Sequence, residues 1–481
     1  MSSSASSSFD LDDPTETAAA QLLFEIEDLD QQPLLKRLST RRLLLLTCPS
    51  LGLQVCWFLL QTSGTPCLRA IGINPSWISL IWALGPIFGA FFQPVIGQIS
   101  DELRHPWGRR KPVMLAGAGT VSLSVLVMAY ALKLATPDAS AWQPRALAVT
   151  CLLIILFAIN AFSVGVRAIV VDVCPASQQP AAAAWAMRWN VLGSAVLSML
   201  GVVSTLQGRR DTDPVAMFFK LALVAALLST VTVGLVCVLV PDTTPPRSKY
   251  QAGGIRRVVT MCQASEIYRR WGQLPPLTGQ VCGVQLIAWL GWFPVLYYMS
   301  TYAYETALYE AAHHLRPEAR AEHYASYASL SFALGTLLCT LILTIFTTTR
   351  LLNPENLPKL WLSSQLLATI SLLLTIPLQT TTAAFILLAL IGGTWAVTMW
   401  VPFALVNTEL ASLCTGAAGA QGLHNMAISL PQVASALVCA VVLAGLDILG
   451  MEHGVIWLLR LASIPAGWST WLIWRLDDDS A

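Results

Sequence analysis

Three ionisable side chains lie within long apolar stretches of this chain, where a charge is costly and usually serves a function. Arg167 and Asp172 fall in one stretch, and Arg188 stands near the start of the next. We interpret them as a charge network beside a solute path, able to bind the solute, gate its passage or hold a proton. A buried ion cluster that only locks two helices together explains the same residues equally well. The five-residue spacing of Arg167 and Asp172 places them on different helical faces, which favours a closer pairing of Asp172 with Arg188.

A second set of polar groups in the apolar stretches consists of amides and indoles. Aromatic faces beside amide groups suit a neutral, hydroxyl-rich or amphipathic ligand. Gln54 and Gln285 stand in similar contexts, since each follows a glycine by two residues and precedes a tryptophan, as two related halves of a chain would show. The candidates for a substrate path are Gln54, Trp57, Asn160, Gln285, Trp289, Trp395 and Asn425.

A third charged group falls between two apolar stretches. Asp101 is followed by Arg109 and Arg110 in a short polar segment. We expect these three residues to form a compact charged hinge at one membrane surface.

Other chemistries lack the residues that they need. We find no catalytic constellation and no glycine-rich loop that would hold a phosphate. The cysteines show no metal-ligand spacing. The sequence therefore predicts no enzyme, no metal site, no cofactor and no nucleotide-driven pump, and nothing in it indicates a nucleic-acid partner.

The elements that position these groups are membrane-spanning helices. Hydrophobic residues make up 55% of the 481 residues and charged residues 11%, and the mean hydropathy is +0.62. A spanning helix needs about 20 mainly apolar residues. The sequence predicts an all-α membrane protein with twelve transmembrane helices, near 42–62, 77–98, 112–134, 147–173, 183–206, 215–241, 276–302, 324–348, 358–378, 382–409, 416–446 and 454–475.

The charges that flank these spans predict their orientation. Most of the flanking Lys and Arg fall on the side that holds the N-terminus, which the positive-inside rule makes cytoplasmic. An even number of spans returns the C-terminus to the same side. We expect a disordered cytoplasmic tail (1–40), a six-helix half (41–241), a cytoplasmic central loop (242–275), a second six-helix half (276–475) and a short cytoplasmic tail (476–481).

Several blocks of sequence resemble one transporter family. They include G-P-I-F-G-A-F-F-Q-P-V-I-G-Q-I-S-D before W-G-R-R-K-P, then A-I-N-A with R-A-I-V-V-D, then V-Q-L-I-A-W-L-G-W-F-P and G-L-H-N-M-A-I-S-L-P-Q. They are similar to the glycoside–pentoside–hexuronide cation symporters of the major facilitator superfamily, in the sucrose-transporter-like branch, and the fungal members are the most similar. The resemblance covers 42–475 and implies the major facilitator fold, alternating access and proton-coupled uptake of sucrose or another α-glucoside.

The chain departs from that family at positions that bear on coupling. The resemblance implies acidic residues where Leu60 and Leu156 stand, and a glutamine where Ser163 stands. Carboxylates with shifted pKa values are the usual means of coupling protons to transport. Asp172 is the remaining candidate for the coupling proton.

We therefore expect a secondary active transporter of a small, mostly neutral solute, with a sugar or an α-glucoside as the first class. An exporter of a small hydrophobic metabolite is the alternative, favoured by the two leucines and the many aromatics, and a third reading is a sensor that keeps the fold without transport. The expected partners are the solute, the lipid bilayer and, as a candidate, protons. We expect a monomer in the plasma membrane.

Overall fold

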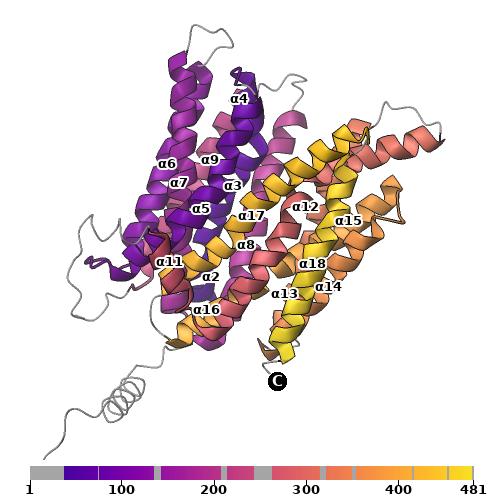
Figure 1. Cartoon of the computed structure of the whole chain (residues 1–481). Helices are drawn as coiled ribbons and strands as arrows, with labels where there is room; N and C mark the ends of the chain where they lie inside the picture. Colours follow the sequence, from indigo (N-terminus) through magenta and orange to yellow (C-terminus); the bar gives the residue numbers. More distant parts are fainter. Residues whose placement is uncertain are drawn as a thin grey trace, which may run out of the picture. The chain divides into compact units, whose positions relative to one another are not determined.

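Helices make up nearly all of the chain that the computed structural model describes (Figure 1). The described residues are 37–73, 75–134, 142–206, 214–242, 263–314, 321–348, 354–413, 417–451 and 454–478, and no strand occurs among them. Most of the predicted tail at 1–40 and most of the predicted central loop lie outside these ranges. The described helices all belong to one compact unit, Leu38–Ala481.

The first half of the predicted membrane region begins with a helix that is interrupted twice. The first interruption is at Pro49, whose ring nitrogen carries no N–H group. The second is a π-helical segment that begins at Leu60. The elements are α2 (Thr40–Thr47), α3 (Pro49–Leu59), η1 (Leu60–Gly64), α4 (Thr65–Ala70), α5 (Pro75–Glu102), α6 (Lys111–Leu134), α7 (Trp142–Val173), η2 (Ala176–Gln178), α8 (Gln179–Leu206) and α9 (Pro214–Leu239).

A short helix, α11 (Ala264–Trp271), falls within the predicted central loop. Glu266 forms ion pairs with Arg269 and Arg270, each at 2.7 Å. The hydrogen bond from Arg269 is the main reason why the pKa of Glu266 falls to about 2. Glu266 therefore stays ionised at physiological pH.

The second half consists of long helices with one interruption, where Met399 and Trp400 precede Pro402. The elements are α12 (Pro276–His314), α13 (Ala321–Thr348), η4 (Pro354–Asn356), α14 (Leu357–Leu374), α15 (Thr381–Thr398), α16 (Val401–Leu413), α17 (Ala417–Ile448) and α18 (Gly454–Asp478). The last helix continues through the first residues of the predicted C-terminal tail.

Each of the twelve predicted spans falls on one of these helices or on a pair of them. In the described part of the chain, nine helical segments are long and apolar enough to cross a membrane. The helices α5, α8 and α18 are not among these nine.

Acidic side chains cap the N-termini of several helices. The first N–H groups of a helix have no partner within it and carry partial positive charge, so a carboxylate there is stabilising. Glu409, for example, accepts hydrogen bonds from the backbone N–H of Leu277 and of Thr278, at 3.0 and 2.6 Å. The caps are Asp101 on α17, Asp242 on α6, Glu305 on α18, Glu310 on α15 and Glu409 on α12.

Helices of the two predicted halves pack closely along α5 and α17, with further contacts between α8 and α16 and between α7 and α17 (Figure 1). Two glycines permit the close approach of α5 and α17. A Cβ atom on Gly97 would overlap the backbone of Ala418, and one on Gly422 would lie 2.5 Å from the Cα of Pro94. Small residues at such crossings let helix backbones meet in a membrane.

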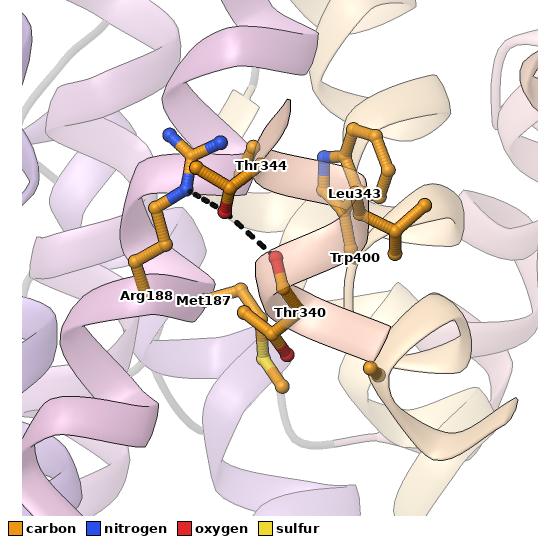
Figure 2. A pocket seen from close by; sticks show the side chains of 8 residues that line it. Met187, Arg188, Thr340, Leu343, Thr344 and Trp400 are labelled. Carbon is orange, nitrogen blue, oxygen red and sulfur yellow. Dashed lines mark hydrogen bonds between the residues drawn. The ribbon is translucent and has the colours of Figure 1, made fainter. Parts of the chain in front are cut away.

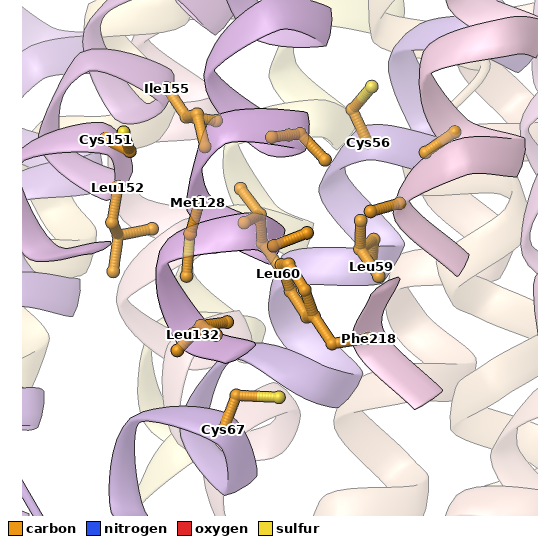
Figure 3. Packing of buried hydrophobic residues seen from close by; sticks show 14 of the residues in the cluster. Cys56, Leu59, Leu60, Cys67, Met128, Leu132, Cys151, Leu152, Ile155 and Phe218 are labelled. Atoms are coloured by element: carbon orange, nitrogen blue, oxygen red, sulfur yellow. The ribbon is translucent and has the colours of Figure 1, made fainter. Parts of the chain in front are cut away.

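The core of the first half is apolar where the family resemblance implies carboxylates. Figure 3 shows Leu60 among Leu59, Met128 and Phe218. Leu60 and Leu156 are both fully buried in this cluster. Leu60 also begins the π-helical segment of the first span.

Candidate solute path and its charge network

Asp172 pairs with the predicted hinge. Its Oδ2 lies 2.9 Å from Nη2 of Arg109 and 2.6 Å from Nε of Arg110. Arg110 is fully buried and also contacts Asp101, with Nη2 and Oδ1 2.6 Å apart. Of the predicted charge network, Asp172 alone therefore joins the predicted hinge. The expected pairing of Asp172 with Arg188 is wrong, since Asp172 pairs with Arg109 and Arg110 instead. The positions that meet here are far apart in sequence, so helix periodicity could not reveal the pairing.

This network joins the two predicted halves. Asp101 accepts hydrogen bonds from the backbone N–H of Gly419 at 2.8 Å and of Ala418 at 3.3 Å, both at the start of α17. Asp101 thus satisfies Arg110 and a helix N-terminus at once. Because the network holds α5, α7 and α17 together, any movement between the halves at this end must break it.

Arg167 lies apart from that network. Its Nη1 donates to Oδ1 of Asn425 at 3.4 Å, and its guanidinium stands 4.7 Å from the ring centroid of Phe403. Both partners belong to the second half, whereas Arg167 belongs to α7. Within the described ranges, no carboxylate forms an ion pair with Arg167. The Arg167 side chain therefore bridges the halves through an amide and an aromatic face.

Arg188 faces a different part of the junction between the halves. Its Nε donates to Oγ1 of Thr344 at 2.8 Å (Figure 2). Its guanidinium lies 4.3 Å from the centroid of the Trp185 ring. Arg188 also lines a small hollow of about 20 Å³ with Met187 and Trp400. Ligand sites are usually about 300–1,000 Å³, so this hollow alone does not form a site for a large solute.

The predicted path residues of the first half have partners within the protein. Gln54 donates from Nε2 to Oγ of Ser194 at 3.0 Å. Asn160 accepts from Nε2 of Gln93 at 2.8 Å and donates to the backbone oxygen of Leu156. Trp57 is half-buried and packs against the apolar core of this half.

Asn425, a predicted path residue of the second half, also has partners. Its Nδ2 donates to the backbone oxygen of Gly89 at 3.3 Å and to Oγ of Ser429 at 3.1 Å. Since Gly89 belongs to α5, Asn425 contacts both halves, as Arg167 does. The structure thus brings together Arg167 and Asn425, which the sequence had placed in separate groups.

The remaining path residues cluster in the second half. The Trp395 ring centroid lies 5.5 Å from that of Trp289 and 5.0 Å from that of Trp292. Four buried polar atoms here have no hydrogen-bond partner within the described protein. They are Nε1 of Trp289, Nε1 of Trp292, and Oε1 and Nε2 of Gln285. A buried polar group left without a partner costs about 1–3 kcal/mol.

Three residues of this region were not among the predicted path residues. Trp292 falls on the face of Gln285 and Trp289, and their spacing could have revealed it. Gln93 holds Asn160. His424 is buried on α17, with its ring 4.9 Å from that of Phe403 and its Nε2 unpartnered within the protein. The sequence carried no signal for the contact between His424 and Phe403.

The long apolar helices of the described chain define a helical membrane protein. The chain belongs to the Major Facilitator Superfamily, whose family profile matches residues 52–436. It is thus a membrane transporter rather than an enzyme, as the sequence had predicted, and its closer resemblance to the sucrose-transporter-like branch is confirmed by the curated relatives.

Two of these relatives match most of the chain. The "General alpha-glucoside permease" of Schizosaccharomyces pombe is 28% identical, over 89% of this chain and 92% of that protein. The "Sucrose transport protein SUC4" of Arabidopsis thaliana is 26% identical, over 82% of this chain and 83% of that protein.

Solved structures match the fold. A crystal structure of the transporter FucP in the outward conformation superposes with a TM-score of 0.61 at 14% identity, covering 90% of this chain and 98% of that one. At this identity, the likeness concerns the fold alone.

Proposed function

We propose that this chain is a secondary active transporter of a sugar, with α-glucosides as the first class to test. The similarity to an α-glucoside permease and a sucrose transport protein supports this substrate class. The observation that carries the proposal is the unpartnered amide and indole groups of Gln285, Trp289 and Trp292, which are uncharged and suit hydroxyl groups. A ligand with a net charge would find no opposite charge in this cluster.

Transport would proceed by alternating access, with the two six-helix halves moving against each other. The contacts of Asp101 with the start of α17, and of Arg167 with Asn425, would hold the halves together in the present state. Since Asp101 lies at the end that the charge pattern makes cytoplasmic, we assign this state as closed toward the cytoplasm. On this assignment both termini are cytoplasmic. We further propose that the protein works as a monomer in the plasma membrane.

We assign any coupled proton to Asp172. Leu60 and Leu156 cannot carry a proton, and both lie in an apolar cluster. Asp172 can, but in the present state it is held in ion pairs with Arg109 and Arg110. A proton could reach Asp172 once the closed end opens and these ion pairs separate.

One observation favours export of a small hydrophobic metabolite instead. The buried leucines replace the two carboxylates that would engage a proton and sugar hydroxyl groups, and they leave that part of the first half apolar. An exporter would deplete a preloaded cell of its metabolite and would not take up saccharides.

Uptake of labelled maltose and sucrose into a yeast strain without its own α-glucoside transporters tests the proposal. Saturable uptake of either sugar above the empty-vector strain is the expected result. Absence of uptake for every saccharide tried, with the protein present at the cell surface, would refute the sugar assignment.

A further inference from the structure

One face of α12 carries three buried side chains whose polar atoms have no partner in the protein. Gln285, Trp289 and Trp292 are four and three residues apart, which places them on one side of the helix. Gln285 is fully buried, and neither its Oε1 nor its Nε2 forms a hydrogen bond. Among the buried side chains in the described ranges, it is the one amide with both ends unpaired. Buried polar groups are rarely left so, and each instance needs an explanation.

Aromatic and apolar side chains surround this face. Trp395 of α15 lies against both indoles, with ring centroids 5.5 and 5.0 Å away. Phe332 of α13 stands 6.4 Å from Trp395 and belongs to the same cluster. Aromatic faces of this kind pack against the C–H groups of a pyranose ring, and the N–H groups beside them can donate to its hydroxyl groups.

The first half offers fewer free groups among its path residues. The Nε2 of Gln54 is already bonded to Ser194, and Asn160 uses its amide for Gln93 and for a backbone oxygen. These amides hold helices together. Among the predicted path residues, the buried polar atoms without a partner in the described chain are those of Gln285 and Trp289, both on α12.

We propose that Gln285, Trp289 and Trp292 form a subsite that binds the hydroxyl groups of one pyranose ring, which packs against Trp395. Gln285 supplies an acceptor and a donor, and each indole supplies a donor. This inference rests on the proposed function and names the half of the protein that recognises the sugar. It assigns recognition to groups that lack partners until the ligand arrives.

The test uses the full-length chain, with Gln285→Leu and Trp292→Phe as the variants. Leucine keeps most of the volume of Gln285 without its polar atoms, and phenylalanine keeps an aromatic ring without the N–H group. Gln365→Leu is the matched control, because Gln365 is a buried amide of the same half whose Nε2 is bonded to Ser469. The half-saturation concentration for maltose uptake and the melting temperature with and without maltose are measured for each protein.

We expect Gln285→Leu and Trp292→Phe each to raise the half-saturation concentration about tenfold, the effect of losing about one strong hydrogen bond. Gln285→Leu should not lower the melting temperature of the sugar-free protein, because it removes unpaired polar atoms. It should abolish the rise in melting temperature that maltose causes. Gln365→Leu should lower the melting temperature and leave the half-saturation concentration unchanged.

Two results are decisive against the subsite. An unchanged half-saturation concentration in both variants, in a protein that does transport maltose, would overturn it while leaving the proposed function intact. A lower melting temperature of sugar-free Gln285→Leu with an unaltered maltose response would assign Gln285 to the protein's own packing. If the parent protein transports no saccharide at all, the proposed function fails, and the subsite fails with it.

Discussion

Arg167 contacts residues of the second predicted half, and no carboxylate in the described chain forms an ion pair with it. It stacks on Phe403 and bonds to Asn425, and cation–π contacts contribute about 0.5–2 kcal/mol. We expect Arg167→Ala to lower sugar uptake at least tenfold without preventing membrane insertion, because removing a buried charge does not hinder insertion. Uptake normalised to surface expression measures the effect.

The conservative variant separates charge from geometry. Lysine keeps the charge of Arg167 but loses the planar group that stacks on Phe403. Partial uptake by Arg167→Lys is expected. Equal uptake by Arg167→Ala and the parent, at equal surface levels, would refute a functional role and leave Arg167 a packing residue.

Asp172 holds the charge network together, and we propose it as the carrier of a coupled proton; one substitution tests both roles. Asp172→Asn leaves Arg110 with Asp101 as its remaining carboxylate in the network and removes the carboxylate that Arg109 pairs with. Breaking a buried ion pair costs about 3–5 kcal/mol, so we expect a clear fall in the thermal unfolding midpoint. The exposed Asp447 provides a control, since Asp447→Asn should leave the midpoint unchanged.

If Asp172 also carries the coupling proton, the same variant should lose the alkalinisation of the medium that sugar uptake causes. Sugar exchange across the membrane should persist in that case. Persistent alkalinisation in Asp172→Asn would exclude this carboxylate as the proton carrier.

At the scale of elements, the junction of α5 and α17 depends on close backbone approach. A side chain at Gly97 would meet the backbone of Ala418. We expect Gly97→Val to separate the helices, to weaken the bonds of Asp101 to α17 and to reduce uptake strongly. Gly119→Ala is the control, since nothing lies within 4 Å of the added Cβ. Normal uptake by Gly97→Val would show that this contact does not take part in transport.

The helices were predictable because long apolar stretches have few alternatives in a membrane. The interruptions were harder to predict. Pro49 and Pro402 could have revealed two of them, since proline lacks a backbone donor. The π-helical segment at Leu60–Gly64 is followed by Pro66 at the second position of α4, so a proline accompanies this interruption too. Long-range pairs, such as Asp172 with Arg110, follow only from the packed arrangement.

For the whole molecule, the contacts of α5 and α7 with α17 support the alternating access that we propose, since they join the two predicted halves. The sequence predicted the twelve spans and most of the polar groups that stand at the junction. It could not predict which amides are already bonded within the protein, because that depends on which helices meet. This difference between Gln54, which has a partner, and Gln285, which has none, is what the structure adds.

The most direct test of the central claim is counterflow in liposomes that contain the purified protein. Liposomes loaded with unlabelled maltose are diluted into labelled maltose, and the label that enters is followed over time. This assay requires no proton gradient, so it separates sugar transport from coupling. We predict a transient accumulation of label that Arg167→Ala abolishes. Entry of label no faster than into protein-free liposomes, for maltose and for sucrose alike, would contradict sugar transport by this protein.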